Sequence, residues 1–329
     1  MLKYALTRIL WTIPIVLGVV IIVYTISFLS PGDPVLLKIS NEYTEEQYAA
    51  AAAQMGLDKP YIVQVANYLW NMVTKFDLGK SYNTDAPVTY LLSARIPVSF
   101  KLSLANIVIM LAIGLPLGII SALKRYSALD VGLTSLSLFL MAIPSYVLAL
   151  LGALVFGVIL RWLPISGLDT WQAWILPLFC SAGGGIASYT RMSRTTMLEV
   201  IKQDYIRTAR AKGLNERVII VKHALKNCLI PLVTMLGAQI SRLFSGAIVI
   251  ETIFAVPGVG LLLRTAITNR DYPVINGCVL VISALVCMAN MCVDIAYAFI
   301  DPRIKARFTS SKRSKKKIEN LLSEKRGAL

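Results

Sequence analysis

Charged residues are scarce in this 329-residue sequence. Asp, Glu, Lys and Arg make up 16% of it, hydrophobic residues make up 56%, and the mean hydropathy is +0.66. Soluble domains carry charge on about a quarter of their residues. The composition therefore excludes an ordinary cytosolic domain, a disordered chain and a small disulfide-rich scaffold, and it favours a protein that is solvated mainly by lipid.

Catalytic and nucleotide-binding patterns are also missing. His223 is the single histidine, and the sequence contains no HExxH, GxSxG or GxxxxGK(S/T) motif. The first two motifs supply the metal site or the nucleophile of common hydrolases, and the third binds the phosphates of ATP. We therefore expect no enzyme activity, no catalytic residue, no metal site and no cofactor in this chain. Any energy that its function consumes must come from a partner or an ion gradient.

Long apolar runs are abundant. A helix that rises 1.5 Å per residue needs about 20 residues to cross the ~30 Å hydrocarbon layer, and it must be a helix because an open strand leaves backbone groups unpaired in lipid. The sequence predicts an all-α integral membrane protein with six transmembrane helices. Four runs are uninterrupted, and two contain one charge each, Arg242 or Asp294. The runs are residues 9–32, 102–123, 131–160, 170–190, 227–250 and 272–300.

The positive charge is distributed unevenly between the connections. The net charge of +15 divides into +2, +1, +6 and +7 for the N-terminus, residues 124–130, residues 191–226 and residues 301–329. The other connections carry −2, 0 and 0, and Lys101, Arg242 and Asp294, in or beside the apolar runs, supply the remaining +1. Because an excess of Lys and Arg marks the cytoplasmic side, we expect both termini in the cytoplasm, and this topology explains the charge better than nucleic-acid binding does.

These patterns give the expected domain organisation. Residues 1–30 form an N-terminal transmembrane helix, and residues 31–97 form a small helical cap outside the cytoplasm, with helices predicted from Thr44 as N-cap and from Pro60. Residues 98–308 form a five-helix core that contains a basic loop at about 191–228. Residues 309–329 form a basic cytoplasmic tail near anionic lipid headgroups. All five cysteines lie in or beside apolar runs, so no disulfide is expected.

The basic loop contains a predicted helix over residues 199–214, which ends near Gly213. One interpretation is that its charge only sets topology. The other is a short helix that lies along the membrane and docks into another protein, because the pattern Thr-Ala-Arg-Ala-Lys-Gly at 208–213 exceeds what topology requires. Composition alone leaves the two interpretations open.

The run from Tyr205 to Pro231 resembles the EAA loop of ABC-importer permeases, in the form used by the dipeptide, oligopeptide and nickel branch. Arg207 and Thr208 replace the Glu and the first Ala of the generic motif. Other segments resemble the same branch in the same order over about residues 1–308. They include Pro31-Gly32-Asp33-Pro34, Gly114-Leu115-Pro116-Leu117-Gly118, Glu251-Thr252-Ile253-Phe254, Pro257-Gly258-Val259-Gly260 and Asp301-Pro302-Arg303.

The resemblance implies a type I ABC importer in a bacterial plasma membrane. A second similar permease, two ABC ATPase subunits that bind ATP and Mg, and an extracytoplasmic binding protein would be its partners. The EAA helix would fit a groove of the ATPase, with Gly213 allowing a turn, Ala209 and Ala211 allowing close approach, and basic side chains pairing with acidic ones. The coupling residues would be Glu199, Asp204, Tyr205, Arg207, Thr208, Ala209, Arg210, Ala211, Lys212 and Gly213. Gly213→Asp or a bulky residue at 209 is predicted to abolish transport.

A second group of residues is a candidate for the gate and the translocation pathway. Residues 251–272 resemble the exterior gate region, although a tight connector explains the same turn. Arg242 lies about 12 Å from the outer face and should face the pathway or a carboxylate, because facing lipid costs roughly 2.5–3.5 kcal/mol. Asp294 is expected to be a structural partner. The candidates are Arg242, Glu251, Phe254, Pro257, Gly258 and Asp294.

The expected function is therefore the permease subunit of an ATP-driven importer for di- and oligopeptides, working by alternating access. A permease for nickel or another small solute is the alternative within the family. An ion-coupled secondary transporter is the alternative from another class. It would need paired repeats and intramembrane carboxylates, and the sequence shows only Asp294 and no evident repeat.

Overall fold

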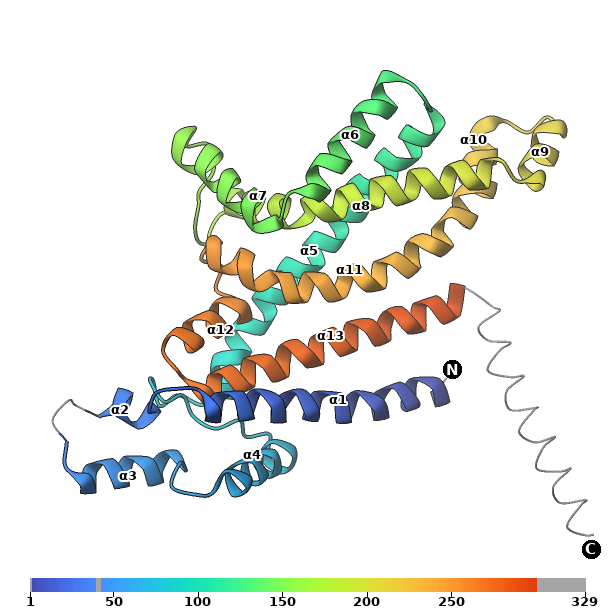
Figure 1. The fold of residues 1–329 in the computed structure, drawn as a ribbon. Coiled ribbons are helices and arrows are strands. Elements are labelled where there is room, and N and C mark those ends of the chain that lie inside the picture. The colour runs from blue at the N-terminus through green and yellow to red at the C-terminus, as the bar shows by residue number, and fades with distance from the viewer. Residues whose placement is uncertain (1, 40–42, 301–329) are drawn as a thin grey trace, which may run out of the picture.

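The structure is a computed structural model that describes residues 2–39 and 43–300, and these residues fold into a bundle of helices (Figure 1). Apart from an isolated bridge between Lys80 and Pro87, the described residues contain no β-structure. The predicted all-α class is confirmed. The expected tail at 309–329 and the segment Asp301-Pro302-Arg303 lie outside the described residues.

In chain order the helices are α1 (Leu2–Leu29), α2 (Pro34–Lys38), α3 (Glu45–Met55), α4 (Tyr61–Lys75), α5 (Val88–Leu123), α6 (Ala128–Ala142), α7 (Ser145–Gly152), α8 (Ile175–Ile201), α9 (Asp204–Ala211), α10 (Glu216–Val218), α11 (Leu225–Ile253), α12 (Val259–Thr268) and α13 (Tyr272–Ile300). Two π-helical segments, η1 (Ala153–Ile159) and η3 (Ile219–Ala224), and one 3₁₀ turn, η2 (Trp171–Trp174), adjoin them.

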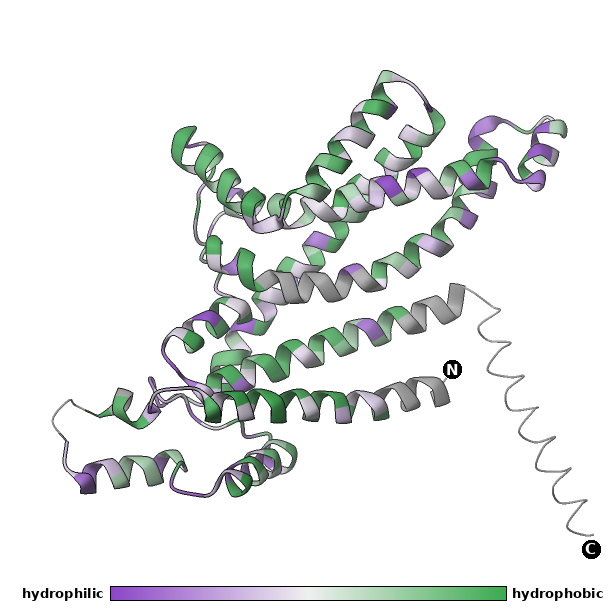
Figure 2. Ribbon diagram, in the orientation of Figure 1, coloured by the Kyte–Doolittle hydropathy of each residue, from purple (hydrophilic) through white to green (hydrophobic). Residues whose placement is uncertain are grey.

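The bundle has two distinct ends. The α9–α10 segment lies at the same end as the start of α1 and the end of α13, and we call this the inner end (Figure 1). Helices α2, α3 and α12 lie at the opposite, outer end. Hydrophilic residues gather around α9 and α10 and around the cap helices, whereas the long helices between them are mostly hydrophobic (Figure 2). This arrangement is typical of a bundle that crosses a membrane.

Three described helices, α1, α5 and α13, are each long and apolar enough to cross a membrane. Two bent helix pairs raise this number to as many as five, if each pair is one span. Helix α8 has 27 residues and therefore a length of about 40 Å. Gly, Ser and Thr residues lower the hydropathy of α8. Such residues are compatible with its position, since α8 packs against α5, α6, α7 and α11 and does not face lipid along its whole length. The count of six spans stays a prediction.

Two predicted spans differ from the observed helices. The run 131–160 is not one straight helix, because α6 and the α7–η1 segment meet at 99°. Pro144 precedes α7, and its ring forces Ile143 into an extended conformation that ends α6. The second difference is α5, which begins at Val88 instead of 102, so its 36 residues run through the expected domain boundary at 97.

The centre of the fold is the crossing of α5 and α8. A Cβ at Gly114 would lie 2.7 Å from Tyr189 Cβ, and a Cβ at Gly118 would lie 2.3 Å from the carbonyl oxygen of Thr190. Only glycine fits at both positions, which are four residues apart on one face of α5. The two backbones therefore approach closely through a small-xxx-small pattern. Tyr189 is fully buried there and donates a hydrogen bond to the carbonyl of Leu232 on α11, at 3.1 Å.

The cap packs on the outer ends of the long helices. The N-cap predicted at Thr44 is confirmed, and it belongs to a capping box, since Gln47 N donates to Thr44 Oγ1 and Thr44 N donates to Gln47 Oε1. The loop after α4 is held by Asp271, at the start of α13, which accepts hydrogen bonds from Ser81 Oγ at 2.5 Å and from Tyr82 N at 3.0 Å. A polar cavity of about 990 Å³ lies between the cap and the outer ends of α1 and α13.

Candidate functional site

The first candidate site is the inner loop, residues 202–224, which contains α9, α10 and η3. Helix α8 ends at Ile201, and the extended backbone of Gln203 (φ −70°, ψ 149°) starts α9 in a new direction. The predicted single helix over 199–214 is therefore wrong: Glu199 belongs to the last turn of α8, and α9 covers only 204–211. The predicted turn at Gly213 is confirmed by its φ of +74°, a conformation that favours glycine.

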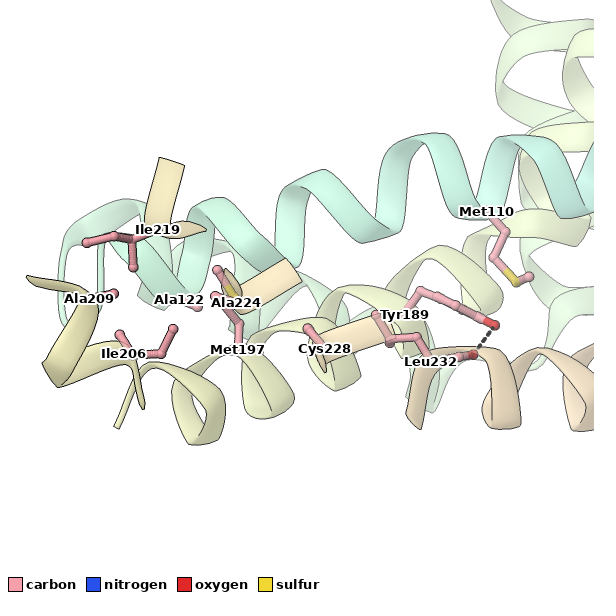
Figure 3. Close-up of a cluster of buried hydrophobic side chains, with 10 residues drawn as sticks. All are labelled: Met110, Ala122, Tyr189, Met197, Ile206, Ala209, Ile219, Ala224, Cys228 and Leu232. Atoms are coloured by element: carbon pink, nitrogen blue, oxygen red, sulfur yellow. Dashed lines mark hydrogen bonds between the residues drawn. The ribbon is translucent and has the colours of Figure 1, made fainter. Parts of the chain in front are cut away.

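One face of α9 is anchored in the protein's own core. Ile206 is fully buried and Ala209 nearly so, and both join a cluster with Ala122 of α5 and Met197 of α8 (Figure 3). Ile219, Ala224 and Cys228 complete the cluster from η3 and α11. Helix α9 packs mainly against η3, and its buried side chains belong to the same close-packed cluster as residues of α5, α8 and α11.

The opposite face of α9 is exposed. Its exposed residues are Asp204, Tyr205, Arg207, Thr208, Arg210 and Ala211, and Lys212 continues them. Arg210 was expected to pair with a partner protein, but in the structure it forms a two-pronged ion pair with Glu216, with Nη2–Oε1 at 2.5 Å and Nε–Oε2 at 3.1 Å. The guanidinium holds the pKa of the Glu216 carboxyl below its usual range. Among the described residues, Arg207 and Lys212 form no ion pair.

The second candidate site lies at the outer end, where α11 turns into α12. Glu251 is completely buried and is held by three donors. Ser99 Oγ donates to its Oε1 at 2.6 Å, and the N–H groups of Gly260 and Leu261 donate to its Oε2 at 2.6 and 3.2 Å. The carboxylate therefore satisfies the free N–H groups at the start of α12, where a negative charge is also favoured by the helix dipole.

The other gate candidates surround this carboxylate. A Cβ at Gly258 would lie 2.4 Å from the Glu251 carboxyl group, so glycine is required there for space. Phe254, together with Val256, is fully buried against Leu102 and its neighbours in the core. Pro257 is partly buried between them and α12. The side chains of Arg242 in α11 and Asp294 in α13 lie outside the described residues.

Comparison with known proteins assigns the family. Residues 114–306 match the binding-protein-dependent transport system inner membrane component, and residues 1–105 match the N-terminal region of the same family. The chain belongs to this family of inner-membrane permeases. The permease is 37% identical over 316 residues to the oligopeptide transport system permease protein AppB of Bacillus subtilis, with 93% of this chain and 100% of that protein covered.

Two further comparisons agree. The permease is 35% identical over 333 residues to the dipeptide transport system permease protein DppB of Alkalihalophilus pseudofirmus, with 93% of this chain and 100% of that protein covered. Its fold resembles that of the MetNI methionine ABC transporter in an inward-facing conformation, with a TM-score of 0.55 and 19% identity over 65% of this chain and 97% of that chain. The permease therefore has the fold of an ABC importer permease.

A small cavity inside the helix bundle, lined by both apolar and polar residues, is a third feature of the permease. It has a volume of about 300 Å³ and lies between α5, the α6–α7 bend, α8 and α11. Asn106, Ser145, Ser181, Ser188 and Gln239 provide uncharged polar groups on its walls. No sequence motif indicated this cavity, because its lining is contributed by five different helices, α5, α6, α7, α8 and α11.

Sequence reasoning also missed a buried ion pair in the permease. Asp130, at the start of α6, is almost completely buried and accepts hydrogen bonds from Arg194 of α8, with Nε–Oδ1 at 2.6 Å and Nη2–Oδ2 at 2.8 Å. Ser121 Oγ and Tyr126 N donate to the same carboxylate. Both charges had been counted only as topology signals. In the structure they fix the α5–α6 connection to α8 at the inner end.

The Glu251 contacts give a testable prediction. Glu251→Ala leaves three buried donors without an acceptor, and each costs about 1–3 kcal/mol. We expect a clearly lower unfolding temperature of the purified permease and faster trypsin cleavage near α12. Glu251→Gln is the matched control: its amide oxygen can accept from Gly260 and Leu261 while its NH₂ group donates to Ser99, so most of the stability should remain. Equal loss in both variants would contradict the anchoring role.

Proposed function

We propose that this chain is one of two permease subunits of an ATP-driven importer of di- and oligopeptides. Relatives named as oligopeptide and dipeptide permeases align with it over more than nine-tenths of its length, and this observation carries the proposal. An extracytoplasmic binding protein delivers the peptide, and a second homologous permease completes the pathway. The chain has no phosphate-binding loop of its own, so two partner ATPases bind ATP and Mg.

The proposed topology has six spans and both termini in the cytoplasm of a bacterial cell. Three observations support it. The start of α1, the end of α13 and the basic inner loop lie at one end of the bundle (Figure 1). The basic connections among the described residues, 124–130 and 191–226, belong to that same end. Helix α8 supplies the sixth span, since its length suffices and its polar faces are covered by other helices.

The proposed coupling mechanism uses the two faces of α9. Its exposed face, with Tyr205, Arg207 and Lys212, docks into an ATPase subunit. Its buried face, Ile206 and Ala209, is packed against the inner ends of the spans, so movement of the ATPases tilts α5, α8 and α11 together. Tilting opens the pathway alternately to either side of the membrane.

The docking assignment is tested by crosslinking in the assembled transporter. Arg207→Cys, on the exposed face of α9, should crosslink to a cysteine in the ATPase with high yield. Tyr126→Cys is the control, because Tyr126 is exposed at the inner end but lies in the α5–α6 connection outside the inner loop. Crosslinks at 126 and none at 207 would contradict the assignment.

The substrate assignment is tested separately by uptake into proteoliposomes. With the binding protein, both permeases and the ATPases present, labelled di- and tripeptides should be taken up only with ATP. Nickel uptake measured in the same vesicles distinguishes the alternative. ATP-driven uptake of nickel without peptide uptake would refute the peptide assignment while leaving the ABC permease fold intact.

A further inference from the structure

Helix α4 of the cap contacts the rest of the protein through only one of its faces. Tyr61, Gln64 and Tyr68, at positions i, i+3 and i+7, face the outer end of α1. Tyr61 OH is 2.6 Å from Thr25 Oγ1, Tyr24 OH donates to Gln64 Oε1 at 3.2 Å, and the rings of Tyr24 and Tyr68 lie 5.5 Å apart. This spacing places the contact residues on one side of the helix.

A stripe of apolar residues occupies the opposite side of α4. It consists of Ile62, Ala66, Trp70 and Val73, which we call the α4 stripe. At 100° per residue these side chains fall within an arc of about 80°, roughly opposite the face that contacts α1. Ile62 is 77% exposed, Trp70 68% and Val73 62%. Phe76, 81% exposed, extends the apolar surface at the end of the helix.

The position of α4 along α1 shows what can cover this stripe. Its contacts on α1 are Tyr24, Thr25 and Phe28, all within the last six residues of a helix that ends at Leu29. At 1.5 Å per residue, α4 therefore lies within about 8 Å of the outer end of this span. Helix α1 itself exposes Ile22, Ile26 and Leu29 at the same level, and these side chains face lipid in a membrane-spanning helix.

The third side of α4 is mostly polar, with the apolar Val63, 41% exposed, at its border with the α4 stripe. Asn67 and Asn71 lie between the contact face and the stripe, line the cavity beneath the cap, and are joined by Thr74. The helix contains no acidic residue, and Lys59 and Lys75 flank its two ends. In contrast, α3 packs against the short helix α2 and begins with Glu45 and Glu46. A protein face, a water face and an apolar face with terminal lysines are typical of a helix that lies in a membrane interface.

We propose that α4 lies flat in the leaflet at the outer end of the bundle, with the α4 stripe inserted among the acyl chains. Trp70 occupies the headgroup boundary that tryptophan prefers, and Lys59 and Lys75 reach the lipid phosphates. The stripe continues the lipid-facing surface of α1, so lipid covers it rather than another protein. The cap is thereby anchored at a fixed depth, which holds the roof of the 990 Å³ cavity at a constant height above α13.

The test measures the depth of single residues in the assembled transporter, reconstituted in liposomes of phosphatidylethanolamine and phosphatidylglycerol. Nitroxide labels are placed at Ile62→Cys, Trp70→Cys and Val73→Cys in a background without native cysteines. Asn67→Cys and Thr74→Cys on the polar side are the matched controls. We expect each stripe label to collide with oxygen several times more often, relative to a water-soluble nickel chelate, than the control labels do.

Two results would overturn the proposal. Stripe labels that collide with the nickel chelate as often as the controls would show that the stripe faces water. Stripe labels shielded from both reagents would show that a protein covers the stripe. Repeating the measurement without the binding protein would show whether the binding protein is that cover. None of these outcomes depends on which substrate is carried, so failure here is distinguishable from failure of the peptide assignment.

Discussion

Replacing Ala209 with tryptophan is expected to abolish ATP-driven uptake while the permease remains in the membrane. Ala209 is buried in the cluster that joins α9 to α5, α8 and α11. Tryptophan adds far more volume than the cluster can accommodate, and overpacking of this kind costs roughly 1–3 kcal/mol or displaces the backbone. The displaced helix can no longer transmit force from an ATPase. The measurement is peptide uptake by the reconstituted transporter, with membrane-inserted protein quantified in parallel.

Ala209→Ser is the matched control for this prediction, because serine is nearly isosteric and its hydroxyl can bond to a carbonyl one turn earlier in the helix. Uptake should stay within about twofold of the wild type. Gly213→Asp provides a contrast. Its φ of +74° strains any L-residue by roughly 1 kcal/mol, but no atom lies within 4 Å of the added Cβ. The sequence alone predicted that Gly213→Asp also abolishes transport, but the open space around the added Cβ leads us to expect a smaller effect than that of Ala209→Trp. The reverse order would show that the turn matters more than the packing.

Gly118→Leu is expected to cause the largest loss of folded protein. The new Cβ would lie 2.3 Å from the carbonyl oxygen of Thr190 and 2.5 Å from Ser193 Cβ. The Thr190 carbonyl is backbone inside α8, so α5 and α8 must separate along their crossing. We expect a penalty of at least ~3 kcal/mol, at the upper end of overpacking effects. Size-exclusion profiles of the detergent-solubilised permease should show aggregate in place of the monodisperse peak.

Gly132→Leu is the control for this prediction. Gly132 lies in α6, and nothing is within 4 Å of a Cβ built there. Leucine also favours a helix more than glycine does, by roughly 0.5–1 kcal/mol. This variant should therefore give a normal profile. If Gly118→Leu behaved in the same way, the close approach of α5 and α8 would not be essential for folding.

The sequence predicted the features that depend on local chemistry. The start of α13 at Tyr272, the N-cap of α3 and the turn at Gly213 are all set by residues within a few positions of one another. Apolar length alone misjudged the run 131–160, because the count ignored how Pro144 restricts Ile143. Contacts between residues that are far apart in the sequence could not be predicted from local chemistry. The Asp130–Arg194 pair links positions 64 apart, and the Ser99–Glu251 bond links positions 152 apart.

For the candidate sites, too, the sequence predicted the local features and missed the contacts between distant residues. The basic composition located the inner loop. It could not show that Arg210 forms an ion pair with Glu216, or that Ile206 and Ala209 are buried in the hydrophobic cluster. At the outer end, the sequence located the motif that begins at Glu251, but it could not show that Phe254 is buried in the core. An aromatic residue in a loop is compatible with an exposed gate or with a buried anchor, and only the packing of Leu102 and its neighbours decides between them.

Helix α5 is a single long helix that contacts both candidate sites, one near each of its ends. Ala122, near its inner terminus, belongs to the cluster that holds α9, and Ser99, 23 positions earlier, donates the hydrogen bond to Glu251. The distance along the helix between these residues is about 35 Å. A rotation of about 5° around one of them shifts the other by about 3 Å, which is the length of one hydrogen bond. A rigid tilt of α5 at the inner end would therefore displace Ser99 by enough to break its hydrogen bond to Glu251.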